Sequence, residues 1–193
     1  MRFSREELES YRGGTVPDVL SDGVDLVFAG VNPGLRSAAI GASFANKGNR
    51  FFRALHLSGI TDRVIDTSHG FDTEDLAYLA HRRVGFTTLV NFATAKASEL
   101  TVDQLVEGRR SLERTILHYQ PSVVAMLGVT AYRTAFADPS ATTGRQATRI
   151  GRSQIWVVPN PSGLNAHYSL GQLAVAYREA AIAAGIRVLP ERQ

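Results

Sequence analysis

The sequence predicts an α/β fold, a three-layer sandwich with a mainly parallel four-stranded sheet between two layers of helices. Four short runs are almost continuously apolar, which is typical of strands that are covered on both faces. Helical patterns lie between and after these runs, and this alternation favours parallel strands joined by helices. The expected strands are residues 24–29, 86–90, 122–127 and 154–158.

The expected helices carry recognisable start and stop signals. Thr101 with Gln104, and Ser169 with Gln172, match the capping-box pattern at the start of a helix. Gly185 fits the glycine that commonly ends a helix. The expected helices are residues 49–58, 73–82, 102–119 and 170–184.

The chain length of 193 residues suits one domain with its own core. We expect that domain to span residues 23–193 and to follow an N-terminal extension, residues 1–22, with a short helix over residues 5–11. Apolar residues make up 44% of the chain and charged residues 20%, which is ordinary for a globular protein that acts in water. We expect the protein to act as a monomer.

Composition and residue spacing exclude several classes of site. The chain has no cysteine, which rules out disulfides, cysteine zinc sites and iron–sulfur clusters bound by cysteine. The five histidines show no metal-ligand spacing, so we expect neither a metal ion nor another cofactor. The charged N-terminal segment does not resemble a signal peptide, and no apolar run reaches the length of about 18 residues that a membrane-spanning helix needs. The expected location is therefore the cytoplasm, with no membrane association.

The acidic residues are unevenly distributed along a chain of formal net charge +3. Residues 26–61 contain no Asp or Glu but carry Arg36, Lys47, Arg50 and Arg53, and residues 139–178 contain none but carry four Arg residues. Segments without carboxylates suit a surface that contacts phosphates, because a like charge would repel the ligand. Chance clustering together with burial is the alternative explanation. In the second segment, Arg145 and Arg149 are the candidate phosphate contacts.

Two loops rich in Asn, Pro and Gly follow the first and the last predicted strands. Residues 30–34 read GVNPG, and residues 159–165 read PNPSGLN. In open α/β sheets, ligands bind beyond the carboxyl ends of the strands, where these two loops would meet. The sequence therefore predicts a cleft between the loops, formed on rigid turns that let a ligand approach the backbone closely.

Three segments together resemble one enzyme family. They are GVNPGLRS at residues 30–37, FANKGNRFF at residues 44–52 and NPSGLN at residues 160–165. Over residues 24–189 the chain is similar to the mismatch-specific uracil-DNA glycosylases, the bacterial branch related to thymine-DNA glycosylase within the uracil-DNA glycosylase superfamily. The resemblance implies an α/β fold around a parallel four-stranded sheet. It also implies a monofunctional DNA N-glycosylase that initiates base excision repair. Such an enzyme flips uracil, or a related deaminated or damaged base, notably opposite guanine, out of double-stranded DNA and hydrolyses its N-glycosidic bond.

The resemblance also implies a role for individual residues. Asn32 would position the attacking water, and Phe44 would stack on the flipped pyrimidine. The segment that enters the base stack as a wedge would be Gly163, Leu164 and Asn165. The other residues of the base pocket would be Val31, Ser37 and Asn160.

This assignment agrees with the chemistry of the residue types. An asparagine amide has no useful basicity near neutral pH, so Asn32 can orient water but hardly deprotonate it. Residues 26–61 contain no carboxylate that could serve as a local base. Flipping costs a few kcal/mol of lost stacking, which an apolar wedge and stacking on an aromatic ring, worth about 1–3 kcal/mol, would offset. Backbone N–H groups near O2 of the departing uracil would stabilise its negative charge.

Some positions depart from the family pattern. A basic residue usually follows the wedge leucine by two positions, whereas this chain has Ala166 and then His167. The segment after the second strand, which is often similar to Asp-Arg-Pro-Thr, reads NFAT at residues 91–94. Both changes leave the preferred lesion and the opposite base open.

Other roles remain open for several of these residues. Asn32 could only shape a turn, Phe44 could belong to the core, and Ser37 could cap a helix. Phe51 and Phe52 follow on the expected helix and are predicted to be core residues. The alternative function is a catalytically weak or inactive nucleic-acid-binding domain of the same fold.

Overall fold

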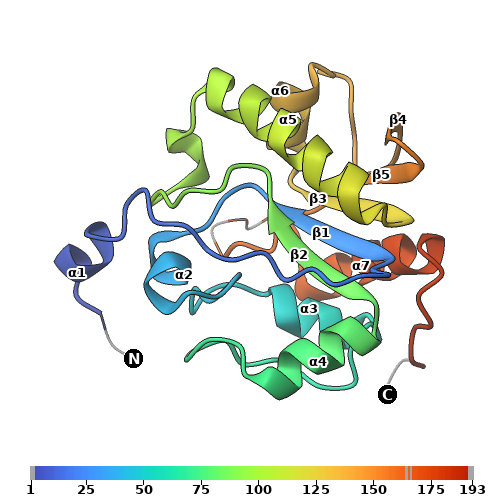
Figure 1. Cartoon of the computed structure of the whole chain (residues 1–193), viewed down its shortest axis with the longest axis horizontal. Helices are drawn as coiled ribbons and strands as arrows, with labels where there is room; N and C mark the ends of the chain where they lie inside the picture. The colour runs from blue at the N-terminus through green and yellow to red at the C-terminus, as the bar shows by residue number, and fades with distance from the viewer. Residues whose placement is uncertain (1–2, 164, 166, 191–193) are drawn as a thin grey trace.

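The protein is built around one central sheet (Figure 1). The computed structural model describes residues 3–163, 165 and 167–190. In this part of the chain, five strands form the sheet in the order β2-β1-β3-β5-β4. The strands are β1 (Leu26–Gly30), β2 (Val84–Thr88), β3 (Val123–Leu127), β4 (Gly144–Ile150) and β5 (Ser153–Val158). The pairs β1·β2, β1·β3 and β3·β5 are parallel.

The predicted count of four strands is wrong, because β4 adds a fifth strand at the edge of the sheet. β4 runs antiparallel to β5, and the four strands predicted from the sequence form the parallel part. The sequence of β4, GRQATRI, is mostly polar, and its residues alternate between exposed and half-buried positions until Ile150. An edge strand with one solvated face lacks the continuous apolar run that identified the other strands.

The helices agree with the sequence where a clear start signal is present. α5 (Val102–Tyr119) matches its predicted range, and α7 (Leu170–Ala183) ends one residue early. In both helices the capping box predicted at the start is formed. α3 (Phe51–Leu57) and α4 (Thr73–His81) lie within their predicted ranges. Short elements that the sequence analysis did not identify are α2 (Leu35–Ile40), α6 (Val129–Phe136) and the 3₁₀ helix η1 (Ala97–Glu99).

Helices cover both faces of the sheet, which confirms the predicted three layers (Figure 1). Side chains of β1 alternate between the two layers. Phe28 packs with Phe51 of α3 and Tyr177 of α7, with ring centroids 5.2 Å away in each case. Val27 belongs to the other core cluster, which includes residues of α5 and α6. The described helices include none that is long and apolar enough to cross a membrane.

The N-terminal segment packs against the sheet and the first loop. Its helix α1 (Arg5–Glu9) is shorter than the predicted range. Val19 forms an antiparallel bridge with Phe86, which lies in the edge strand β2. The segment thus pairs with part of an edge that would otherwise offer free backbone groups to another chain.

Candidate active site

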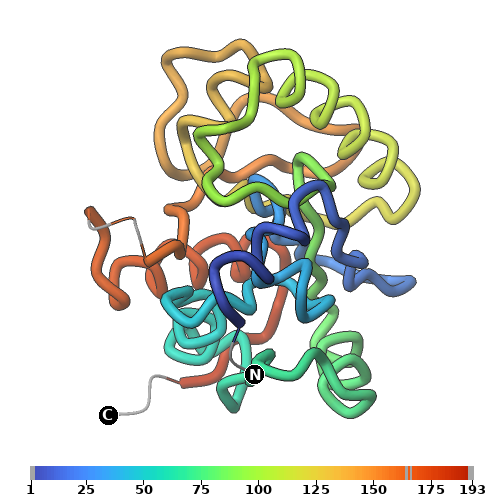
Figure 2. Tube along the Cα trace, turned by 90° about the vertical axis from the view of Figure 1, so that its left-hand side faces the viewer, coloured from blue at the N-terminus to red at the C-terminus, as the bar shows by residue number. Residues whose placement is uncertain are grey.

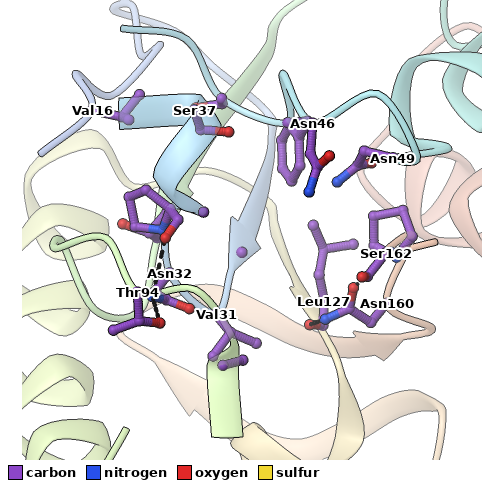
Figure 3. A pocket seen from close by; sticks show the side chains of 18 of the residues that line it. Val16, Val31, Asn32, Ser37, Asn46, Asn49, Thr94, Leu127, Asn160 and Ser162 are labelled. Carbon is purple, nitrogen blue, oxygen red and sulfur yellow. Dashed lines mark hydrogen bonds between the residues drawn. The ribbon is translucent and has the colours of Figure 1, made fainter. Parts of the chain in front are cut away.

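A cavity of about 150 Å³ lies where the loops after β1 and β5 meet, beyond the carboxyl ends of the parallel strands. An apolar cavity of about this volume is known to hold one benzene ring, so a pyrimidine is a suitable occupant by size. In Figure 3, Asn32 and Thr94 lie on one side of the cavity, and Asn160 and Ser162 lie on the opposite side. The two loops that the sequence analysis selected therefore line one site.

The Asn32 side chain is held in one orientation by three acceptors. Its Nδ2 donates to the carbonyl oxygens of Pro33 and Phe92, each at 3.1 Å, and to Oγ1 of Thr94 at 2.8 Å. Carbonyl oxygens accept hydrogen bonds and cannot donate, so the nitrogen of the amide must face them. No described residue donates to Oδ1 of Asn32, which leaves this oxygen as an acceptor for a molecule in the cavity.

The backbone around Asn32 is anchored to the segment that follows β2. The amides of Leu89 and Val90 donate to the carbonyl oxygens of Gly30 and Val31, at 2.7 and 2.9 Å. The amide of Thr94 then donates to the carbonyl oxygen of Pro33 at 3.3 Å. Backbone hydrogen bonds between the two segments thus continue past the ends of the strands, which explains why a turn residue can hold a defined position.

Thr94 is a site residue that the sequence analysis missed. Its hydroxyl accepts from Asn32 and donates to the carbonyl oxygen of Lys96 at 2.8 Å, and its side chain is buried. In the sequence, residues 91–94 stand out only as a departure from a family pattern. Thr94 could have been found as a hydroxyl residue that soon follows β2, a strand parallel to β1 whose carboxyl end lies at the same edge of the sheet.

Phe44 lines the cavity and stacks on Phe51, with ring centroids 3.8 Å apart and an interplanar angle of 20°. It is half-buried, whereas Phe51 and Phe52 are core residues as predicted. Its φ of 60° lies in the left-handed region that non-glycine residues rarely adopt. Strained backbone is found where function needs a side chain in a particular place, and here it presents a ring to the cavity.

Ser37 and Val31 also line the cavity. Ser37 does not cap a helix, because it lies inside α2 and the cap position is Gly34. Its buried hydroxyl accepts from the backbone N–H of Ala45 at 3.2 Å. Ser37 therefore ties α2 to the residue next to Phe44.

The second loop is held by its own side chains. Asn160 donates from Nδ2 to the carbonyl oxygen of Leu127 at 3.3 Å and accepts at Oδ1 from the amide of Ser162 at 2.9 Å. Asn165 donates from Nδ2 to the carbonyl oxygen of Asn160 at 2.9 Å. These bonds hold the described residues of this loop, 160–163 and 165, in a compact arrangement beside the cavity.

Arg50 ties the second loop to the start of α3. Its guanidinium donates to the carbonyl oxygens of Tyr168 at 2.6 Å, Asn165 at 2.8 Å and Ser162 at 3.4 Å. Arg50 belongs to the segment without carboxylates, residues 26–61. Its guanidinium is directed to backbone carbonyls of the protein itself.

Gly163 allows the second loop to contact the segment that precedes α3. A Cβ atom at Gly163 would lie 2.6 Å from the carbonyl oxygen of Gly48, so a side chain there would force the loop and this segment apart. The predicted wedge residue Leu164, and Ala166 after it, lie outside the described residues.

Comparison with known proteins agrees with this arrangement. A family model for the uracil DNA glycosylase superfamily matches residues 17–184. The chain belongs to the uracil-DNA glycosylase superfamily. This family implies a hydrolase of N-glycosidic bonds in DNA. The chain is also similar to the solution NMR structure of a protein from Methanosarcina acetivorans that was named as a candidate uracil DNA glycosylase. The TM-score is 0.58 at 15% identity, over 90% of this chain and 98% of that one, and at this identity the likeness concerns the fold alone.

Within this superfamily member, the described lining of the cavity contains no carboxylate, and Lys96 is its one charged side chain. The described residues also include no cluster of three or more His, Cys, Asp or Glu side chains that could hold a metal ion. The described lining therefore offers amides, hydroxyls and backbone groups, together with the ammonium group of Lys96.

Further polar residues line the cavity without having been predicted, among them Asn46, Asn49 and Thr88. Asn46 and Asn49 lie on the side between the two loops (Figure 3). Asn49 accepts at Oδ1 from the amide of Phe51 at 2.9 Å, so its Nδ2 is the group that remains for a ligand. Thr88, at the end of β2, has a buried hydroxyl without a partner.

The candidate phosphate contacts Arg145 and Arg149 lie on exposed positions of β4 and do not line the cavity. Because β4 is antiparallel, Arg145 pairs with Trp156 near the carboxyl end of β5, while Arg149 pairs with Gln154 near its start. Arg145 is thus the closer of the two to the edge that carries the site. A phosphate contact by either residue stays a prediction.

Proposed function

We propose that this protein is a mismatch-specific uracil-DNA glycosylase that acts as a monomer. It would release uracil, or a related deaminated or damaged base, notably opposite guanine, from double-stranded DNA as the first step of base excision repair. One observation carries the proposal: the Asn32 amide presents its oxygen to a cavity the size of one pyrimidine. Membership of the superfamily and the two signature loops support it.

The proposed reaction follows from the orientation of Asn32. A water molecule that donates one hydrogen bond to Oδ1 would have a lone pair free to attack C1′ of the deoxyribose. The bond between C1′ and N1 of uracil breaks, and its electron pair leaves with the base as an anion. Because an amide cannot take the proton, the water keeps it until the C1′–O bond forms and then releases it to solvent, and positioning supplies most of the rate.

The departing anion needs donors on the other side of the cavity. An amide nitrogen carries two hydrogens, and Asn160 uses one of them on the carbonyl oxygen of Leu127. The second hydrogen of Nδ2 is available to a carbonyl oxygen of the base. Donors placed where charge develops lower the barrier most, since they need no rearrangement during the reaction.

The cavity would also hold the flipped base. Phe44 is supported on one face by Phe51, so its other face can stack on a pyrimidine without moving. Base–aromatic stacking is worth about 1–3 kcal/mol, which is comparable with the cost of flipping a mismatched base. A base in a mismatch is already weakly paired, and this favours uracil opposite guanine.

The test is a panel of duplexes that each contain one lesion, followed by alkaline cleavage at abasic sites. Uracil opposite guanine should be released fastest among uracil, thymine, ethenocytosine and hypoxanthine substrates. Asn32→Ala should abolish release while the variant still binds the duplex. Asn91→Ala is the matched control, because Asn91 is an exposed amide residue that does not line the cavity. If Asn32→Ala released the base at the wild-type rate, Asn32 would not be the residue that positions the water. Absence of release from every duplex by the wild type would leave the alternative of an inactive nucleic-acid-binding domain.

A further inference from the structure

The N-terminal segment, residues 3–16, contacts two parts of the chain around Asn32. One is α2, which follows the Asn32 loop, and the other is Ala93 in the segment that follows β2. Figure 2 shows the N-terminal segment between α2 and the segment that follows β2. All of it precedes the part of the chain that the family model matches, which begins at residue 17. We propose that this segment is a positioning element for Asn32, in which Arg12 acts through Glu99 and Thr94. The inference rests on the proposed function, since it concerns the rate of base release.

Hydrogen bonds on either side of the Lys96 backbone connect Arg12 to Asn32. Arg12 donates to Oε2 of Glu99 at 2.5 Å, and Oε1 of Glu99 accepts from the amide of Lys96 at 3.0 Å. The carbonyl oxygen of Lys96 accepts from Thr94, whose hydroxyl in turn accepts from Nδ2 of Asn32. Each of these bonds restricts the next, so a change at Arg12 can reach the amide that orients the water.

Backbone pairing gives a second connection. The amide of Gly13 donates to the carbonyl oxygen of Ala93 at 2.9 Å, and the amide of Ala93 donates to the carbonyl oxygen of Gly14 at 2.8 Å. Both backbone groups of Ala93 are therefore held by the N-terminal segment. Its neighbours Phe92 and Thr94 are two of the three acceptors for Asn32.

The same segment is held against α2, which follows the Asn32 loop. A Cβ atom at Gly14 would lie 2.9 Å from the carbonyl oxygen of Tyr11 and 3.4 Å from Cβ of Ala38, so only glycine allows this approach. Arg36 of α2 lies 5.3 Å from the ring centroid of Phe3. Val16, at the end of the segment, is buried and lines the cavity.

Arg12 and Glu99 are both partly exposed, so their ion pair contributes modestly. Arg12 also contacts Glu9 of α1, which orients the guanidinium. The hydrogen bond from Arg12 lowers the pKa of the Glu99 carboxyl below its usual 4.5, so the pair remains charged throughout the neutral range. Because exposed ion pairs are weak, we expect Arg12→Ala to slow base release by about two- to fivefold.

The experiment compares full-length variants under single-turnover conditions with saturating enzyme. Arg12→Ala should lower the maximal rate and leave the affinity for the duplex unchanged, and Arg12→Lys should restore part of the rate. Glu99→Gln keeps an oxygen for the amide of Lys96 but removes the charge. A double variant with Arg12→Ala and Glu99→Gln should be no slower than the slower single variant, because both changes break one interaction. Arg110→Ala is the control, since Arg110 forms a comparable exposed pair with Glu107 on α5.

Gly14→Ala perturbs the segment by a different route and should slow release more than Arg12→Ala does. Unchanged maximal rates in Arg12→Ala and Gly14→Ala would overturn the proposal. Weaker DNA binding at an unchanged maximal rate would also overturn it, because the segment would then be a DNA contact. Additive losses of rate in the double variant would overturn it as well, because the two side chains would then act independently.

A second readout does not depend on activity. Hydrogen exchange at the amides of residues 93–96 should be faster in Arg12→Ala and Gly14→Ala than in the wild type and in Arg110→Ala. If the wild type releases no base from any duplex, the proposed function fails, and exchange alone then tests the connection. Unchanged exchange would show that the segment does not hold residues 93–96, and the proposal would be wrong.

Discussion

Replacing Thr94 by valine tests whether the orientation of the Asn32 amide matters for catalysis. Valine keeps the shape of the side chain and removes the hydroxyl that accepts from Nδ2 of Asn32 at 2.8 Å. The other two acceptors, the carbonyl oxygens of Phe92 and Pro33, remain at 3.1 Å. Both hydrogens of the amide therefore keep a partner, and the side chain gains freedom without being left unsatisfied.

The magnitude follows from the value of one hydrogen bond. A neutral hydrogen bond contributes about 0.5–1.5 kcal/mol net, and each 1.36 kcal/mol in the barrier changes a rate about tenfold. If the bond is fully expressed in the transition state, Thr94→Val should slow base release by about two- to tenfold. The fold should change little, because Lys96, whose carbonyl oxygen loses its donor, is exposed and can bind water instead.

The assay is single-turnover release of uracil from a uracil–guanine duplex with enzyme in excess. Fluorescence anisotropy with the same duplex separates binding from chemistry, and a melting curve checks the fold. Thr94→Ser is the matched control, since serine keeps the hydroxyl and loses only a methyl group. We expect the rate of Thr94→Ser to stay within twofold of the wild-type rate, because the hydrogen bond to Asn32 is kept and the activation free energy should hardly change.

Two results would refute this reasoning. Thr94→Val could release uracil at the wild-type rate, which would mean that the two carbonyl oxygens suffice to orient Asn32. Alternatively, Thr94→Ser could be as slow as Thr94→Val, which would mean that packing of the methyl group, and not the hydroxyl, is the property that matters.

Three other predictions concern the wedge, the phosphate contacts and the core. Leu164→Ala should slow release from duplex DNA more than from a single strand, because a wedge only has to hold a duplex open; equal losses would instead indicate loop packing. Arg145→Ala should weaken duplex binding at every sequence and reduce the salt slope by about 1, whereas Arg149→Ala, farther from the site, should change the slope less; salt titrations of affinity decide between them. Burial raises the pKa of Tyr177 well above its usual 10, and its hydroxyl donates to the carbonyl oxygen of Pro159 at 3.1 Å. As the pH rises, the unfolded chain therefore loses this proton before the folded protein does. The free energy of unfolding should fall above pH 10 by up to about 1.4 kcal/mol per pH unit, and denaturant titrations at several pH values should show a smaller fall for Tyr177→Phe.

Much of the fold could be predicted because its signals are local. The capping boxes at Thr101 and Ser169 mark helix starts within four residues of sequence, and both helices begin where predicted. Buried parallel strands are apolar throughout, which made four of the five strands visible. Edge strand β4 was missed because its alternating exposure leaves a polar sequence.

The meeting of the two signature loops could also be predicted, because parallel strands place their carboxyl ends at one edge. The contacts around Asn32 could not. Thr94 is 62 residues away in sequence, and its contact depends on the register between β1 and β2, which no local pattern specifies. The partners of Arg50 could not be predicted for the same reason: its three carbonyl partners lie more than 100 residues away.

The absence of carboxylates from the described cavity lining changes where selectivity could arise. Without a general base to activate the water, cleavage of the glycosidic bond depends on how readily the nucleobase leaves with the electron pair of that bond. Uracil spreads that charge over two carbonyl groups, whereas cytosine has one carbonyl and an amino group and holds the charge less well. A normal cytosine that entered the pocket by accident would therefore remain attached. Slow chemistry would in this way protect undamaged DNA.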